Sequence, residues 1–137
     1  MSNIRIFVSH RIDIDSETVD TPVYFPVRCG AVYDEEGNSE IQGDDTGDNI
    51  SKLRMSFCEF TVQYWAWKNV DADYYGLCHY RRYLSFSDKH YKNTAFNMVR
   101  ELRLTAHEKK KYHLDDTKKI NSVVQKYDMI IPGLAKA

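Results

Sequence analysis

A dense group of basic and aromatic side chains follows a short apolar run near the middle of the chain. Residues 74–78 have the aromatic and apolar content of a buried strand, and the basic cluster of His79, Arg81 and Arg82 comes directly after it. Open α/β sheets bind ligands at the carboxyl ends of their strands. Two guanidinium groups and an imidazole suit a phosphate or diphosphate, because they are cationic hydrogen-bond donors. The residues themselves therefore predict anion binding and no particular reaction.

The basic cluster also has a second interpretation, in which its arginines lie on a solvated surface. Tyr80 and Tyr83 could carry the stacked side chains of Arg81 and Arg82 through cation–π contacts worth about 0.5–1 kcal/mol each. Residue types and spacing leave both interpretations open.

Two other stretches could contribute to an anion site. The β-rich run Ile4–His10 places His10 at the carboxyl end of an N-terminal strand. Residues 46–51 supply several helix caps in succession, and the first amides of a helix that starts there could bind phosphate. We therefore expect the turn Gly47–Ser51 to lie close to the basic cluster.

A single helix is expected after this turn. Its apolar side chains recur at near-3.6 spacing from Ile50 to Trp65, and apolar residues on its other side predict packing on more than one face. Trp65 and Trp67 are both predicted to be core residues. Glu59 would need a partner wherever this helix buries it, because an unpaired buried carboxylate is costly.

The remaining elements alternate between strand and helix. An extended segment is predicted at 24–32, and the residues 34–48 after it are predicted to form a long loop and candidate lid. Further along, a short helix is predicted at 95–102, and Thr105 and Glu108 could form the capping box of another helix. An amphipathic helix after Asp115 or Asp116 and a last strand at 128–133 complete the chain. This order predicts an α/β fold with a mostly parallel sheet flanked by helices. We expect a single domain over residues 1–137, incomplete at its carboxyl end.

Composition and charge narrow the class of protein. The 137 residues are 42% hydrophobic and 13% aromatic, as in a globular domain, and the formal net charge of −1 argues against a broad nucleic-acid-binding surface. The lysine-rich region 89–119 is most simply a solvated face. Three widely spaced cysteines predict reduced thiols in a cytoplasmic protein, and without a long apolar stretch any membrane association would be peripheral.

No metal site is indicated by the sequence. The triplet Asp71-Ala72-Asp73 is spelled like a known Asp-x-Asp metal motif, but it precedes a strand and would lie at the amino end of the sheet. We therefore expect no metal cofactor. A divalent ion stays an open alternative, although no ligand spacing in the chain favours one.

Several ordered motifs identify a family. They are Val8-Ser9-His10, Tyr24-Phe25-Pro26-Val27, Gly47-Asp48-Asn49-Ile50-Ser51, Cys58-Glu59-Phe60-Thr61, Tyr64-Trp65-Ala66-Trp67-Lys68-Asn69, Tyr75-Gly76-Leu77-Cys78-His79-Tyr80-Arg81-Arg82-Tyr83 and Tyr127-Asp128-Met129-Ile130-Ile131-Pro132. With these motifs the chain resembles a bacterial family labelled domain of unknown function 4422. That family is found in gene clusters for capsule, exopolysaccharide and lipopolysaccharide and is described as glycosyltransferase-like. Its domains are generally longer than this chain.

The resemblance implies a GT-A-like, Rossmann-like nucleotide-binding fold that acts on a sugar nucleotide. The motifs of the resemblance include Trp65, Trp67 and several polar residues that we expect to act in the site. We expect catalytic roles for His79 and Glu59, and substrate-binding roles for His10, Asp48, Asn49, Arg81 and Arg82.

The function that we expect is transfer of a sugar from a nucleoside diphosphate sugar to a saccharide or lipid-linked saccharide, for a capsule, exopolysaccharide or O-antigen. Arg81 and Arg82 would neutralise the diphosphate leaving group, with no need for a metal. The transfer would take place in the cytoplasm or at the inner face of the membrane. The main alternative, favoured by the short chain, is a non-catalytic remnant that binds the nucleotide sugar. Nucleic-acid binding is expected to be weak and salt-sensitive.

Overall fold

A computed structural model describes residues 1–37, 40–92 and 98–133. The chain forms two compact units, Met1–Tyr83 and residues 84–137. The expectation of a single, incomplete domain stays a prediction.

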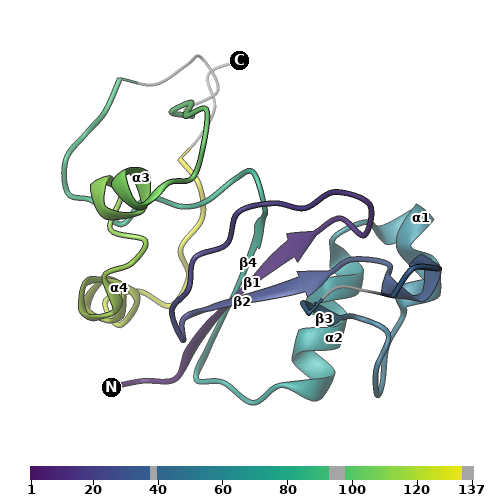
Figure 1. Cartoon of the computed structure of the whole chain (residues 1–137). Coiled ribbons are helices and arrows are strands. Elements are labelled where there is room, and N and C mark those ends of the chain that lie inside the picture. The colour runs from purple at the N-terminus through teal and green to yellow at the C-terminus, as the bar shows by residue number, and fades with distance from the viewer. Residues whose placement is uncertain (38–39, 93–97, 134–137) are drawn as a thin grey trace. The chain divides into compact units, whose positions relative to one another are not determined.

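The first unit is built on a parallel sheet (Figure 1). The central strand β1 (Ile4–His10) pairs with β2 (Tyr24–Arg28) on one side and with β4 (Tyr74–His79) on the other. The short strand β3 (Gln42–Gly43) extends the sheet beyond β2. Every pairing is parallel, so the carboxyl ends of all four strands lie along one edge of the sheet. The predicted α/β class and the mostly parallel sheet are confirmed.

The register places the candidate site residues at this carboxyl edge. Ser9 of β1 pairs with His79 of β4, and His10 pairs with Arg28 of β2. His10 and His79 each end a strand, as the sequence predicts, and the structure shows that the two strands are adjacent.

One face of the sheet is covered by helix α2 (Phe60–Asn69). Trp65 is buried against Phe7 and Phe25, and its indole Nε1 donates to the hydroxyl of Thr46 across 3.0 Å. The buried core of this layer consists of Phe7, Val27, Cys29, Val62, Trp65 and Ala66. The core prediction is therefore confirmed for Trp65. It is wrong for Trp67, which is 64% exposed and lies under the ammonium group of Lys68.

The predicted single helix after residue 50 is wrong, because the chain bends at Cys58. A 3₁₀ helix, η2 (Ser51–Leu53), leads into the short helix α1 (Arg54–Phe57), and Cys58 then adopts a positive φ of 47° before α2 begins. The hydroxyls of Ser51 and Thr61 both donate to the carboxylate of Asp44 across 2.6 Å. In a straight helix these residues would be about 15 Å apart, so one carboxylate could not reach both.

Asp44 is the polar centre of this part of the fold. Its side chain is fully buried, and it also accepts hydrogen bonds of 3.0 Å from the amides of Gly30 and Ala31. These amides lead into η1 (Ala31–Tyr33), a 3₁₀ helix after β2. The segment 40–48, which the sequence predicts to be part of a loop and candidate lid, therefore contains β3 and a buried anchor; residues 38–39 fall outside the described part.

The second unit contains two short helices. The predicted capping box of Thr105 and Glu108 starts α3 (Ala106–Lys111), and Asp116 caps α4 (Thr117–Val124) by accepting from the amide of Lys119 across 3.0 Å. Both predicted caps are confirmed.

Two other predicted elements of the second unit are not seen among the described residues. The start of the predicted helix 95–102 falls outside the described residues, and residues 98–102 are not helical. Residues 128–133 form no strand, and the side chains of Met129 and Ile131 are 80% and 67% exposed. A strand needs a neighbouring backbone to pair with, and these residues find none within the described chain.

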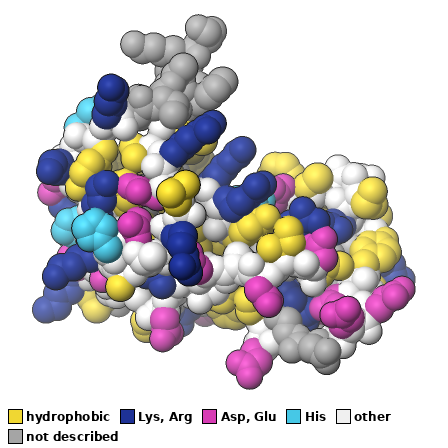
Figure 2. Space-filling view, turned by 45° about the horizontal axis from the view of Figure 1, so that its top comes forward, with side chains coloured by type: hydrophobic (Ala, Val, Ile, Leu, Met, Phe, Trp, Pro, Cys, Tyr) yellow, Lys and Arg dark blue, Asp and Glu magenta, His cyan; other side chains and the backbone are white. Residues whose placement is uncertain are grey.

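The surface carries charges of both signs. Figure 2 shows basic and acidic side chains interspersed over one face, together with hydrophobic groups. Within the lysine run, Lys111 forms a 2.9 Å ion pair with Glu101. Among the described residues, no helix is long and apolar enough to cross a membrane.

Candidate functional site

His10 occupies the carboxyl end of β1 and is 2% exposed. Its Nδ1 lies 2.6 Å from the hydroxyl of Ser16, in the loop that follows β1. Its Nε2 is buried, and no described residue forms a hydrogen bond with it. Burial, together with the nearby His79 side chain, lowers the pKa of His10 below its ordinary value. The imidazole is therefore neutral at physiological pH, and its Nε2 is an unpartnered polar atom among the described residues.

Tyr80 links the ends of the two strands. Its ring centroid lies 4.3 Å from that of His79 and 5.8 Å from that of His10, with interplanar angles of 31° and 26°. Its amide donates to the carbonyl of Ser9 across 3.0 Å, which carries the pairing of β1 and β4 beyond the last paired residues. Tyr80 thus brings the two histidines into one three-ring group.

His79 makes two different contacts through its two ring nitrogens. Nδ1 accepts a hydrogen bond of 3.1 Å from the amide of Arg81, and Nε2 lies 3.9 Å from Oε1 of Glu59. Burial lowers the pKa of His79; Glu59 raises it, and Arg81 and Arg82 lower it. The Glu59 side chain is itself 46% exposed, so it does not need a buried partner, and it lies beside His79 of the basic cluster.

The two arginines of the basic cluster lie in a tight turn. The amide of Arg82 donates to the carbonyl of His79 across 2.8 Å, and both arginine side chains are exposed. The guanidinium carbon of Arg81 is 5.3 Å from the centre of the Tyr80 ring. This is the cation–π contact of the surface interpretation. It leaves the guanidinium hydrogen-bond donors facing solvent, where they can still meet an anion.

Neighbouring charges at the same edge are paired. Arg11 binds Asp13 through two hydrogen bonds, and Arg28 at the end of β2 binds Asp34. Arg28 also donates from Nε to the carbonyl of Ile41 across 2.9 Å. These pairs leave the arginines of the basic cluster as better candidates for binding an anion.

Asp48 lies away from His79. Asp48 accepts a 2.9 Å hydrogen bond from the hydroxyl of Tyr64, and its carbonyl accepts from Asn69 at the carboxyl end of α2. Glu59, which lies beside His79, directly precedes the amino end of α2, and this helix is about 15 Å long. The expectation that the turn Gly47–Ser51 lies beside the basic cluster is therefore wrong for Asp48.

One of the amides expected to bind phosphate in this turn, that of Ser51, is already bonded within the chain. The side-chain oxygen of Asn49 accepts from the amide of Ser51 across 3.2 Å. The element that starts there is a three-residue 3₁₀ helix and not the long helix that the prediction required. Substrate binding by Asp48 and Asn49 stays a prediction. The hydrogen bonds described for these two residues do not connect them to the basic cluster.

Sequence reasoning missed two parts of the candidate site. The sequence predicts for Tyr80 only the support of an arginine, although its position between His79 and Arg81 is a usable signal of a place in the site. Ser16 carries no such signal, because its contact with His10 depends on the path of the loop.

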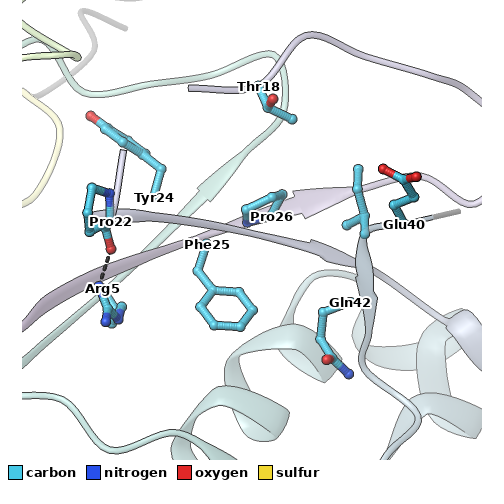
Figure 3. A pocket seen from close by; sticks show the side chains of 9 residues that line it. Arg5, Thr18, Pro22, Tyr24, Phe25, Pro26, Glu40 and Gln42 are labelled. Carbon is cyan, nitrogen blue, oxygen red and sulfur yellow. Dashed lines mark hydrogen bonds between the residues drawn. The ribbon is translucent and has the colours of Figure 1, made fainter. Parts of the chain in front are cut away.

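A separate pocket of about 460 Å³ lies beside β2 (Figure 3). Arg5 on its wall donates to the carbonyl of Pro22. None of the predicted site residues lines this pocket, whose walls are Arg5, Thr18, Pro22, Tyr24, Phe25, Pro26, Glu40, Ile41 and Gln42. Within residues 1–37, 40–92 and 98–133, no three His, Cys, Asp or Glu side chains are grouped so as to hold a metal ion. The expectation of no metal cofactor stays a prediction.

Comparison with known proteins supports the predicted glycosyltransferase-like α/β fold. A solved structure described as the apo form of the WbbM bifunctional glycosyltransferase is 32% identical, with a TM-score of 0.82. The match covers 92% of this chain and 22% of that one, so the chain spans about a fifth of that structure. A search of curated proteins found no match.

The family model described as domain of unknown function (DUF4422) matches residues 5–137. That range includes β1 from Arg5 onward, the basic cluster, and the helices α3 and α4 of the second unit. The chain therefore belongs to the DUF4422 family, and its first unit has a glycosyltransferase-like fold.

Proposed function

We propose that this chain is a glycosyltransferase-type domain that binds a nucleoside diphosphate sugar at the carboxyl edge of its sheet. The observation that carries the proposal is the convergence of His10, His79, Arg81 and Arg82 at the ends of two adjacent parallel strands. The likeness to a bifunctional glycosyltransferase supports the sugar-transfer class.

In this proposal the arginines bind the diphosphate. Negative charge develops on the diphosphate as the bond to the sugar breaks, and fixed cations stabilise that charge in the transition state. Guanidinium groups suit this role, because their donors match phosphate oxygens two at a time. His10 would bond the ligand through its free Nε2, and His79 and Glu59 would face the reacting sugar.

The sugar would pass to a saccharide or lipid-linked saccharide acceptor for a capsule, exopolysaccharide or O-antigen. We place this transfer in the cytoplasm, with at most peripheral association with the inner face of the membrane. The Arg81 and Arg82 charges replace a metal ion in this proposal, so donor binding persists in a chelator.

Calorimetric titration with UDP-glucose and GDP-mannose, with and without EDTA, tests the proposal. Binding of at least one donor in EDTA is the expected result, followed by release of nucleoside diphosphate when acceptor extract is added. Binding without turnover would support the alternative of a non-catalytic nucleotide-sugar-binding module. Absence of binding to either donor, or tighter binding to DNA at physiological salt, would contradict the proposal.

A further inference from the structure

We propose that His79 is held as a neutral imidazole with its proton on Nε2, and that this N–H and the carboxylate of Glu59 together bind one hydroxyl group of the donor sugar. The identity of the ligand rests on the proposed function. The tautomer of His79 does not, because contacts within the chain determine it.

The first contact is the hydrogen bond from the amide of Arg81 to Nδ1 of His79 at 3.1 Å. A backbone amide can only donate, so Nδ1 must be the unprotonated nitrogen and the single proton of the neutral ring must lie on Nε2. Protonation of Nδ1 would break this bond. The bond is part of a tight turn that is also closed by the 2.8 Å hydrogen bond from the amide of Arg82 to the carbonyl of His79.

The charges around His79 favour the same state. Its side chain is 24% exposed, and burial together with Arg81 and Arg82 disfavours a third cation there, while Glu59 acts in the opposite direction. His10 also faces the group and is itself disfavoured as a cation by His79. Nearby, Arg11 and Asp13 largely compensate each other through their ion pair, and Arg54 also acts on Asp13.

The second contact leaves room for a ligand atom. The 3.9 Å between Nε2 of His79 and Oε1 of Glu59 is too long for a direct hydrogen bond. An oxygen atom placed about 2.8 Å from both atoms would complete two hydrogen bonds. That oxygen must accept from the N–H and donate to the carboxylate.

A hydroxyl group meets both requirements, whereas an ionised phosphate oxygen only accepts and would be repelled by Glu59. The two parts of the site therefore suit different groups of the ligand. Phosphate oxygens belong to the exposed donors of Arg81 and Arg82, and the pair of His79 and Glu59 selects a hydroxyl of the attached sugar.

Nitrogen-15 NMR of the imidazole tests the tautomer without any ligand. Between pH 6.5 and 8 we expect Nδ1 of His79 to show the signal of an unprotonated acceptor and Nε2 that of an N–H. Arg81→Ala keeps the amide and should keep the tautomer, whereas Arg81→Pro removes the amide and should mix the two tautomers. A proton on Nδ1 in the wild-type protein, or a doubly protonated ring at pH 7, would overturn the proposal. The wild-type spectrum decides this even if the proline variant does not fold.

Titration of paired ligands tests the hydroxyl. UDP is compared with UDP-glucose, and GDP with GDP-mannose, in the wild-type protein and in His79→Ala, Glu59→Ala and the control Glu35→Ala, which alters an exposed carboxylate. We expect the first two variants to bind the sugar nucleotide about tenfold more weakly and the nucleoside diphosphate within about twofold of wild type.

An equal loss for both ligands would show a phosphate contact, and no loss for the sugar nucleotide would show no contact at all; either result overturns the inference. If the wild-type protein bound neither member of a pair, the proposed function would fail, and the NMR result would still decide the tautomer.

Discussion

The hydroxyl of Thr61 donates a 2.6 Å hydrogen bond to the buried carboxylate of Asp44. Ser51 and the amides of Gly30 and Ala31 complete the shell of this carboxylate, so Asp44→Ala leaves several buried donors without an acceptor. We expect a loss of about 3 kcal/mol or more in the free energy of unfolding. Urea denaturation measures it, and the exposed neighbour Asp45 supplies the control Asp45→Ala, which should change stability by less than about 0.5 kcal/mol. Equal stabilities of the two variants would contradict the anchoring role.

The two tryptophans of α2 should respond differently to truncation. Trp65 is 4% exposed and packs on Phe7 and Phe25, so Trp65→Ala should lower the free energy of unfolding by about 3–5 kcal/mol. Trp67 is 64% exposed, and Trp67→Ala should cost less than about 1 kcal/mol. Each variant serves as the control for the other in thermal or chemical denaturation. Similar losses in both would mean that Trp67 is buried in solution.

Acidification should destabilise the fold before the carboxylates titrate. Burial lowers the pKa values of His10 and His79 in the folded state, whereas the ordinary value in an unfolded chain is about 6.5. Below that pH the unfolded chain binds protons that the folded chain does not, so the stability present above about pH 6.5 falls as the pH approaches the folded pKa values.

Melting temperatures between pH 7.5 and 5.5 measure this effect. We expect His10→Gln to flatten the dependence and the exposed control His107→Gln to leave it unchanged. A wild-type melting temperature that is constant over this range would contradict the neutral burial of the two histidines.

Removal of the Glu59 charge should make His79 harder to protonate. Glu59 raises the pKa of His79, whereas burial, Arg81 and Arg82 lower it, so Glu59→Gln removes the opposing influence. The expected result is a further fall in the pKa of His79, read from an NMR pH titration of its ring. Glu36→Gln, at an exposed carboxylate in another loop, should leave that pKa unchanged. A pKa of His79 that does not change in the variant would show that the two side chains are not neighbours in solution.

The arginines of the basic cluster should govern donor affinity. Arg81→Ala or Arg82→Ala should weaken binding of a nucleoside diphosphate sugar by about 1.5–3 kcal/mol, the range for hydrogen bonds to charged groups. The exposed Arg100 supplies the control Arg100→Ala, which should bind as wild type does. Strict dependence on manganese, with little loss in the two variants, would replace this arginine mechanism with a metal-based one.

Local patterns in the sequence were sufficient for much of the fold. The β-rich runs at Ile4–His10 and Tyr74–His79 both form strands, because side-chain alternation and strand propensity are properties of a few consecutive residues. The caps at Thr105 and Asp116 follow for the same reason, since a cap needs only the residue and the amide three positions later. The basic cluster directly follows a predicted strand in the sequence, and this order was sufficient to predict that His79 lies at the carboxyl end of that strand.

Tertiary contacts alone decided the rest. The helix breaks at Cys58 because a buried carboxylate at Asp44 requires donors from both sides of the break. Residues 128–133 have the composition of a strand but lack a partner, and α2 holds Asp48 about a helix length from Glu59. The state of His79 depends on Glu59, 20 positions earlier in the chain, and on a turn that aims one amide at Nδ1. Such contacts join residues that are distant in sequence or depend on the path of the backbone, so no local period or propensity encodes them.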